Sequence, residues 1–353
     1  MNSPRRLPTL APVFSLILAL AWGAPTSHAA EEAKLAPGMV NPGYHEPPPW
    51  FKESFLDLRD DVKEAAKARR RVLLYFYQDG CPYCSKLISD NFGQKAIADK
   101  TRQHFDVIAI NLWGDREVID LTGKTLPEKV FAKSLKVQFT PTLLFLDEKG
   151  DTVLRLNGYS PPHKFTAALD YIGQHREKKQ NFADYLAAHA KEPASGKLNE
   201  QPWLMPPPLK LAEATKANPK PLLVLFEQKD CAACDEMHDE AFSRPEVMEL
   251  LGKFQIARID MAAKEPLQTP DGASLPARQW ARKIGVHYTP SLVFFAEGKE
   301  VFRVDGYLRP FHLSSSLDYV ASGAYKTQPE FQRFIEARAA ARRAKGEKIE
   351  LMK

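Results

Sequence analysis

The chain has 353 residues, of which 44% are hydrophobic and 26% are charged, and its formal net charge is +5. This length and composition predict a soluble globular protein with two domains of ordinary size. The net charge is too small to argue for nucleic acid or an anionic membrane surface as a partner.

Positions 1–30 have the pattern of a secretory signal peptide. Arg5 and Arg6 precede an apolar stretch at 10–22, and the small residues at 27–29 suit signal peptidase. Because this stretch is too short for a stable membrane-spanning helix, we expect cleavage after Ala29 or Ala30 and export to the periplasm. An uncleaved membrane anchor is the alternative. Cleavage removes both arginines, which lowers the formal net charge from +5 by two, to +3.

The chain after residue 50 alternates between strand and helix patterns. We expect strands at 72–77, 107–111, 142–146 and 153–156, and helices at 84–92, 127–135 and 165–172. The residues from Asp147 to Gly150 have the composition of a hairpin turn between the last two strands. Alternating strands and helices that end in a hairpin predict an α/β domain whose mixed β-sheet has helices on both faces.

The sequence repeats itself with a shift of 148 to 150 positions. The apolar runs 73–78 and 223–228 coincide, and so do Gly158-Tyr159 and Gly306-Tyr307. Matches of this kind over about 100 residues predict one domain fold that is used twice in tandem. We therefore expect a first domain at 50–185, a second domain at 209–326, and a basic, solvated C-terminal helix or tail at 327–353. The proline-rich residues 186–208 between the domains predict a stiff, partly extended linker.

All four cysteines lie in two Cys-x-x-Cys pairs that are 150 positions apart, Cys81 with Cys84 and Cys231 with Cys234. A disulfide that closes so small a loop removes little chain entropy, so the pairs suit thiol–disulfide exchange better than stabilisation. Each pair opens a stretch with helical spacing, and a helix N-terminus favours the thiolate form of the first sulfur. The pattern predicts Cys81 and Cys231 as nucleophiles, and Cys84 and Cys234 as the resolving cysteines.

A Thr-Pro pair follows each cysteine pair at nearly the same distance. The separation from Cys81 to Pro141 and the separation from Cys231 to Pro290 differ by a single position. An extended substrate has to lie across the attacked sulfur, and a cis proline leaves the backbone groups of the preceding residue free to pair with such a segment. The four residues that we expect to bind the substrate are Thr140, Pro141, Thr289 and Pro290.

These residues and their spacing resemble the thioredoxin superfamily, in particular its exported bacterial members, which include the thioredoxins associated with sulfur oxidation. The resemblance covers residues 50–180 and 205–325. It implies two tandem thioredoxin-like domains with cis prolines at Pro141 and Pro290, protein substrates with disulfides or oxidised cysteines, and no cofactor or metal. The Cys-Pro-Tyr-Cys sequence at 81–84 is similar to that of glutaredoxins and some periplasmic isomerases, which favours reduction or isomerisation over oxidation. A reductant in an oxidising compartment implies a membrane thiol–disulfide transporter as electron donor.

The chain departs from the thioredoxin pattern at two positions in each repeat. Tyr75 and Leu225 stand six positions before the first cysteine, where thioredoxin has a buried acid. Gly80 and Asp230 stand where thioredoxin has a tryptophan directly before that cysteine. Glu227 is a candidate for a substitute base in the second domain, and an ordinary exposed glutamate at a strand end is the alternative.

Two other classes of function compete with thiol–disulfide exchange. His238 follows Cys234 by four positions, so Cys231, Cys234 and His238 together offer ligands suited to copper(I) or zinc. The internal repeat aligns His238 with Ile88, however, which favours a packed helix histidine. A redox-silent module that holds partners on its Thr-Pro surface is the other alternative, and two intact cysteine pairs argue against it.

The two cysteine sites should differ in thiol acidity. Asp230, Asp235 and Glu236 place negative charge around the second site, and such charge opposes a thiolate. Our hypothesis is that the pKa of the Cys231 thiol is higher than the pKa of the Cys81 thiol. Thiolate absorbance titration of variants that keep one cysteine pair tests this order, and the reverse order would refute it.

Overall fold

The computed structural model describes residues 44, 46–189, 194–217 and 219–349. The predicted signal peptide at 1–30 lies outside these residues. The described residues belong to one compact unit that contains both repeats. Within the described ranges, none of the helices has the length and apolar character that crossing a membrane requires.

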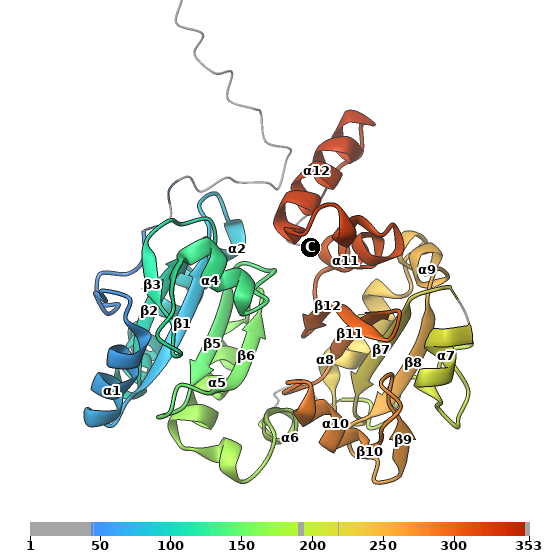
Figure 1. The fold of residues 1–353 in the computed structure, drawn as a ribbon, viewed down its shortest axis with the longest axis horizontal. Helices are drawn as coiled ribbons and strands as arrows, with labels where there is room; N and C mark the ends of the chain where they lie inside the picture. The colour runs from blue at the N-terminus through green and yellow to red at the C-terminus, as the bar shows by residue number, and fades with distance from the viewer. Residues whose placement is uncertain (1–43, 45, 190–193, 218, 350–353) are drawn as a thin grey trace, which may run out of the picture. The chain divides into compact units, whose positions relative to one another are not determined.

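The first repeat is built on a four-stranded mixed sheet (Figure 1). Its central strand β1 (Arg71–Tyr77) pairs in parallel with β2 (Phe105–Asn111) and antiparallel with β5 (Thr142–Leu146). Strand β6 (Thr152–Asn157) pairs antiparallel with β5 at the edge. Every residue of β1 is buried, which explains why its sequence is a continuous apolar run and not an alternating one.

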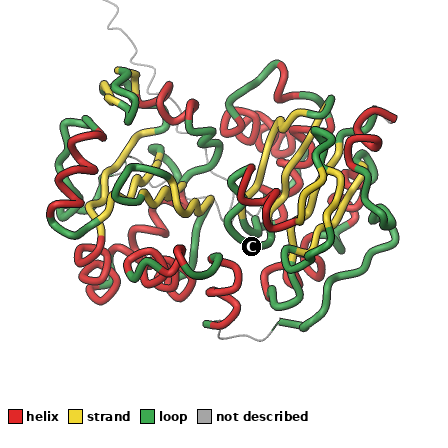
Figure 2. Tube along the Cα trace, turned by 60° about the horizontal axis from the view of Figure 1, so that its bottom comes forward, coloured by secondary structure: helices red, strands yellow, loops and turns green. Residues whose placement is uncertain are grey.

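Helices cover both faces of this sheet (Figure 2). One face of the sheet, which includes Leu73 and Tyr75, packs against the helical segments that follow β1 and β6. The opposite face, which includes Leu74, packs against the helix before β1 and the helix before β5. The first group is α2 (Pro82–Leu87), the π-helix η1 (Ile88–Phe92), α3 (Lys95–His104) and α5 (Pro162–Gly173), and the second is α1 (Leu58–Lys67) and α4 (Glu128–Ser134). The remaining elements are the short hairpin of β3 (Glu117–Ile119) and β4 (Thr125–Pro127), the 3-10 helix η2 (Arg176–Lys178) and α6 (Phe182–Ala188).

The second repeat has the same sheet topology, with the strand order β12-β11-β7-β8. Its strands are β7 (Leu222–Glu227), β8 (Gln255–Asp260), β11 (Ser291–Ala296) and β12 (Lys299–Asp305), and a short hairpin joins β9 (Pro266–Gln268) to β10 (Ser274–Pro276). Its helical elements are α7 (Leu211–Ala217), α8 (Ala232–Glu236), η3 (Met237–Ala241), α9 (Pro245–Leu251), α10 (Ala277–Lys283), α11 (Pro310–Ala321), η4 (Ala324–Lys326) and α12 (Phe331–Ala344). The predicted fold class, two mixed sheets flanked by helices, is confirmed.

Two segments outside the predicted domains also pack against the second repeat. The backbone N–H of Met205, in the predicted linker, donates to the carbonyl of Ile256 on β8 at 2.8 Å. Helix α12 buries Phe331 and Ile335 in the core of the second repeat, so one face of this basic helix is not solvated. These contacts extend the second repeat beyond the ends of its sheet.

The two repeats also touch through equivalent residues. Phe139 belongs to the core of the second repeat and lies with its ring centroid 5.7 Å from that of Phe302. Its counterpart Tyr288 packs against the core of the first repeat. Asn157 donates from Nδ2 to Oδ2 of Asp305 at 3.3 Å, and these two residues are 148 positions apart. Each repeat therefore completes part of the core of the other.

Candidate active site

Each cysteine pair lies where the central strand of a repeat passes into a helix. Cys81 is the N-cap of α2 and Cys231 is the N-cap of α8. The backbone N–H of Cys84 donates toward Sγ of Cys81 at 3.1 Å, and the N–H of Cys234 donates toward Sγ of Cys231 at the same distance. A donor at this position favours a thiolate on the first sulfur of each pair.

The two pairs form disulfides in the structure, Cys81 with Cys84 and Cys231 with Cys234. Cys84 and Cys234 are 0% and 1% exposed, whereas Cys81 and Cys231 are 3% and 6% exposed. One cavity of about 1410 Å³ is lined by Cys81 and Cys231 but by neither of the buried cysteines. The first cysteine of each pair therefore faces the cavity, and the second lies behind it.

Both Thr-Pro peptide bonds are cis, at Thr140-Pro141 and Thr289-Pro290. The carbonyl oxygen of Thr140 lies 3.6 Å from Sγ of Cys81. Thr140, Thr289 and Pro290 line the same cavity as the first cysteines, whereas Pro141 is not part of its lining. The structure thus brings the predicted nucleophiles and the Thr-Pro segments together around one space.

A glycine directly after the last strand of each repeat hydrogen-bonds to the cis proline of the same repeat. The N–H of Gly158 donates to the carbonyl of Pro141, and the N–H of Gly306 donates to the carbonyl of Pro290, both at 2.8 Å. Their φ angles are +76° and +97°, which L side chains rarely adopt. At Gly306 an added β-carbon would also lie 2.6 Å from the hydroxyl oxygen of Tyr288.

Comparison with known proteins identifies the fold of both repeats. A family profile described as a thioredoxin-like domain matches residues 58–173 and 208–321, which is more than half of the chain. The chain belongs to the thioredoxin-like domain family. No curated protein sequence matches it. In a thioredoxin-like chain, two disulfide-forming Cys-x-x-Cys pairs at helix N-termini are the arrangement of a thiol–disulfide oxidoreductase.

Three solved structures illustrate the similarity. A thioredoxin-fold protein from Helicobacter pylori is 25% identical, and the match covers 39% of this chain and 95% of that protein with a TM-score of 0.31. A thioredoxin from Thermus thermophilus is 26% identical, with coverages of 31% and 81% and a TM-score of 0.25. The periplasmic thioredoxin SoxS from Paracoccus pantotrophus is 22% identical, with coverages of 30% and 99% and a TM-score of 0.22.

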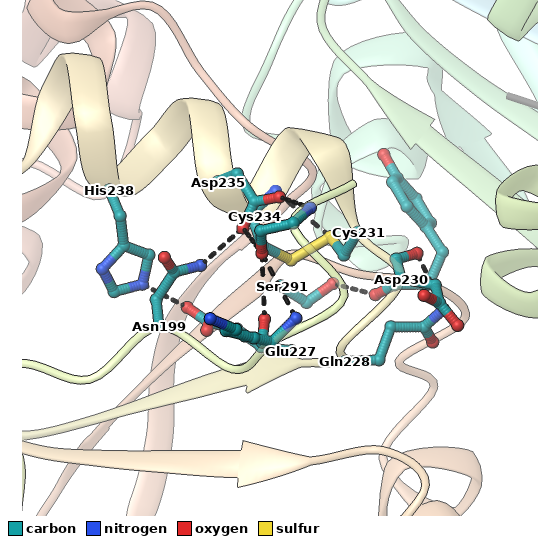
Figure 3. The surroundings of a disulfide bond; sticks show 12 residues. Asn199, Glu227, Gln228, Asp230, Cys231, Cys234, Asp235, His238 and Ser291 are labelled. Atoms are coloured by element: carbon teal, nitrogen blue, oxygen red, sulfur yellow. Dashed lines mark hydrogen bonds and ion pairs between the residues drawn. A yellow bond between two sulfur atoms is a disulfide. The ribbon is translucent and has the colours of Figure 1, made fainter. Parts of the chain in front are cut away.

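Beside the second disulfide of this thioredoxin-like protein lies a buried acid–imidazole pair. Glu227 is 0% exposed and is not the exposed strand-end residue that the sequence left open. Nε2 of His238 lies 2.8 Å from Oε1 of Glu227 (Figure 3). Nδ1 of His238 lies 3.3 Å from Nε2 of Gln201. Both ring nitrogens of His238 thus have partners. The described residues contain no group of three or more histidine, cysteine or acidic side chains that could hold a metal ion.

Two of the three acidic residues that the sequence places at the second site have polar partners. Oδ1 of Asp235 accepts a hydrogen bond from Asn199 at 2.9 Å (Figure 3). Oδ2 of Asp235 accepts one from the backbone N–H of Ser195 at 2.8 Å, and both donors belong to the predicted linker. Glu236 forms an ion pair of 3.2 Å with Arg309. Sequence reasoning named these acids but missed their partners, because no local pattern joins residues 36 to 73 positions apart.

The first site carries a different set of polar contacts. Tyr159 donates from its hydroxyl to Oδ2 of Asp90 at 2.6 Å, and Lys86 pairs with the same carboxylate at 2.8 Å. The ion pair with Lys86 and the hydrogen bond from Tyr159 lower the pKa of Asp90. In the second repeat the hydroxyl of Tyr307 is buried and has no hydrogen-bond partner in the part of the chain that the structure describes.

Two aromatic residues beside Cys81 remain neutral at physiological pH. The rings of Tyr83 and His312 meet edge to face with centroids 5.3 Å apart. Burial raises the pKa of Tyr83 to about 12 and lowers the pKa of His312 to about 4. His312 therefore supplies no positive charge to a Cys81 thiolate at neutral pH, and the N–H of Cys84 remains its stabilising donor.

The lowered pKa of His312 predicts a pH dependence of stability. The ordinary pKa of histidine is 6.5, so between pH 6.5 and pH 4 the unfolded chain binds a proton at His312 that the folded chain does not. The free energy of unfolding should fall as the pH falls through this window, by up to about 1.4 kcal/mol per pH unit from this residue. We expect His312→Gln to flatten the dependence in urea unfolding, with exposed His163→Gln as the control. Identical pH profiles for His312→Gln and the wild type would contradict this expectation.

Proposed function

We propose that this protein is an exported thiol–disulfide oxidoreductase that reduces or isomerises disulfides in protein substrates. The observation that carries the proposal is that Cys81 and Cys231 both line one cavity while Cys84 and Cys234 lie buried behind them. A large open space next to two nucleophilic sulfurs suits a polypeptide segment better than a small metabolite. The cysteine pairs and the family membership support the chemistry, and the direction of electron flow and the compartment are part of the proposal.

The reaction at the first site follows from this order of exposure. The Cys81 thiolate attacks one sulfur of a substrate disulfide, and the other substrate sulfur leaves as a thiolate and takes up a proton. The Cys84 thiol then loses its proton and attacks Sγ of Cys81. The mixed disulfide breaks, the substrate is released with both cysteines reduced, and Cys81 and Cys84 are left as a disulfide. The second site performs the same steps with Cys231 and Cys234.

The Thr-Pro segments are proposed to hold the substrate during the attack. Thr140 and Thr289 line the cavity, and the carbonyl oxygen of Thr140 lies close to the attacking sulfur of Cys81. Backbone groups at this position can pair with an extended substrate segment as an added strand does. Such pairing recognises backbone and not side chains, so it suits an enzyme that accepts several protein substrates.

Each turnover in the reducing direction leaves a cysteine pair oxidised, so the protein needs two electrons and two protons from a donor. In an exported protein we propose that a membrane thiol–disulfide transporter supplies them. The proposal of export rests on the signal-peptide pattern of residues 1–30 and on the use of every cysteine in an exchange site.

The direction of electron flow is tested by the reduction potential of each cysteine pair. We expect potentials at or below roughly −180 mV, the range of isomerases and thioredoxin, whereas values near −120 mV would assign oxidation instead. The measurement equilibrates the mature protein with graded dithiol buffers and counts alkylated cysteines by mass.

The Cys84→Ser and Cys234→Ser variants should accumulate mixed disulfides with protein substrates, and the Cys81→Ser and Cys231→Ser variants serve as controls that cannot form them. A pair that does not cycle would refute the proposal for its repeat.

Export is tested by expressing the full chain in a bacterial host and measuring the intact mass of the protein in the periplasmic fraction. We expect the mass of a chain that begins at Ala30 or Glu31. A full-length protein in the membrane fraction would assign the uncleaved anchor, and a full-length protein in the cytoplasm would refute export.

A further inference from the structure

Helix α12 belongs to the second repeat, but its first residues bind the first repeat. The helix starts at Phe331 and buries this residue in the core of the second repeat. The backbone N–H of Phe331 donates to Oε1 of Gln138 at 3.4 Å, and Nε2 of Gln332 donates to the carbonyl oxygen of Gln138 at 3.0 Å. These hydrogen bonds join residues that are 193 and 194 positions apart, and the exchange reaction as written above has no use for them.

The residues that α12 contacts lead directly into the Thr-Pro segment of the first repeat. Gln138 and Phe139 immediately precede Thr140. Phe139 is 3% exposed, and the centroid of its ring lies 5.1 Å from that of Phe331. Because Gln332 binds the carbonyl of Gln138 and the next side chain is buried in the second repeat, the backbone reaches Thr140 from a fixed position.

A second contact from α12 reaches the segment that precedes the first cysteine pair. The guanidinium of Arg333 lies over the indole ring of Trp113, 5.1 Å from the ring centroid, which is an attractive cation–π geometry. Nε1 of Trp113 donates to Oε1 of Gln78 at 2.9 Å. Gln78 lines the cavity and stands three positions before Cys81. Helix α12 is thus linked to the Thr-Pro segment and also to the segment that leads to the nucleophile.

The first repeat has a shorter counterpart of α12. Helix α6 follows α5 and η2 just as α12 follows α11 and η4, and it has 7 residues where α12 has 14. The ring centroid of Phe182, the first residue of α6, lies 5.7 Å from that of Tyr288, which directly precedes Thr289. An aromatic contact is therefore made in each direction between the repeats.

The two polar contacts are made in one direction only. The internal repeat aligns Gln332 with Ala183, which has no side-chain donor, and Trp113 with Ala262, which has no ring. The equivalents of the amide hydrogen bond and of the cation–π contact therefore cannot form at the second site. The chain thus contains one site with both links and one site without them, which provides an internal comparison on the same fold.

We propose that Gln332 and Arg333 of the second repeat position the polypeptide-binding surface of the first site. The inference deepens the proposed function and rests on it, because that function has Thr140 pair with an extended segment of a protein substrate. A substrate strand binds more tightly when its backbone partners are already in place, since ordering them on binding costs free energy. Gln332 supplies this order through Gln138, and Arg333 supplies it through Trp113.

This role separates polypeptide substrates from small disulfides. A polypeptide needs backbone partners at Thr140, whereas a small disulfide needs only access to Sγ of Cys81. Loss of the α12 contacts should therefore weaken polypeptide binding and leave the reactivity of the sulfur unchanged. Gln332 also lines the cavity, whereas Arg333 is not part of its lining, so Arg333 distinguishes positioning from a direct contact with the substrate.

The experiment measures the first site alone in the full mature chain, with the second site removed by Cys231→Ser and Cys234→Ser. The reduced protein, in excess, cleaves two extended peptides that are joined by one disulfide and carry a fluorophore and a quencher. We expect Gln332→Ala to raise the half-saturating protein concentration about fivefold and Arg333→Ala about threefold, with maximal rates within about twofold. The rate with dithiobis(nitrobenzoic acid), a small disulfide, should stay within about twofold of the unsubstituted rate.

Matched variants separate positioning from a general loss of stability. Lys345→Ala removes an exposed basic residue at the C-cap of the same helix and should change neither the half-saturating concentration nor the maximal rate. Arg333→Lys keeps a cation over the ring of Trp113 and should bring the half-saturating concentration back to within about twofold of the unsubstituted value.

The second site supplies the other control. In the reverse background, with Cys81→Ser and Cys84→Ser, the second site alone cleaves the peptides. Gln332→Ala and Arg333→Ala should leave this cleavage unchanged, although both residues belong to the second repeat.

Three results would overturn the inference. An unchanged half-saturating concentration in Arg333→Ala would remove the positioning role, and this exposed position keeps the test open if Gln332→Ala does not fold. Equal losses with the peptides and with the small disulfide, or equal losses at both sites, would assign α12 a role in stability only. A first site that fails to cleave the peptides without any α12 substitution is a different result, because it refutes the proposed function of that repeat.

Discussion

The step from a fully buried strand into a helix is the constraint on which the rest of this molecule depends. Strands β1 and β7 are buried on both faces, so the positions of their ends are fixed. The turn after each strand places a cysteine at the N-cap of the next helix. This placement buries Cys84 and Cys234, brings a backbone N–H to each first sulfur, and leaves Cys81 and Cys231 at the cavity. The difference in access between the two cysteines of each pair is therefore a property of the backbone.

The two repeats use this common backbone with different surroundings. The first site has aromatic neighbours, with Tyr83 held neutral by burial and packed on His312. The second site has acidic neighbours, of which Asp235 accepts a hydrogen bond from Asn199 and Glu236 forms an ion pair with Arg309. It also has the buried carboxylate of Glu227, which contacts His238. A duplicated fold thus allows two exchange sites to be tuned separately while each remains tied to the core of the other.

Sequence reasoning recovered the elements that carry continuous apolar runs and the two cysteine pairs that form disulfides. The strand predicted at 72–77 is β1, and the helix predicted at 84–92 is α2 followed by η1. Helices α1 and α3 were not predicted because charged residues dominate both, with only one or two large apolar side chains per helix to set a period. The proline-rich composition of 186–208 predicts an extended chain. It does not predict that Met205 in this segment hydrogen-bonds to Ile256 on β8.

The contact between Glu227 and His238 was beyond reach of the sequence for a geometric reason. Each residue was considered separately, one as a base and the other as a metal ligand. His238 lies in the π-helical turn η3 (Met237–Ala241), which follows α8. Helical spacing alone assumes about 3.6 residues per turn and does not reveal such a turn. The repeat shows a simultaneous change from Tyr77 and Ile88 to Glu227 and His238, but two substitutions at separate positions do not establish a contact.

Gly306 limits how this protein can be redesigned. Its backbone angle and the hydroxyl of Tyr288 both exclude a side chain there, whereas at Gly158 the neighbouring side chain of Leu308 leaves an ordinary van der Waals distance and only the backbone angle stands in the way. Engineers who wish to retarget the second site therefore have one fixed anchor in the loop after β12, and variation for new substrates has to come from the residues that follow it.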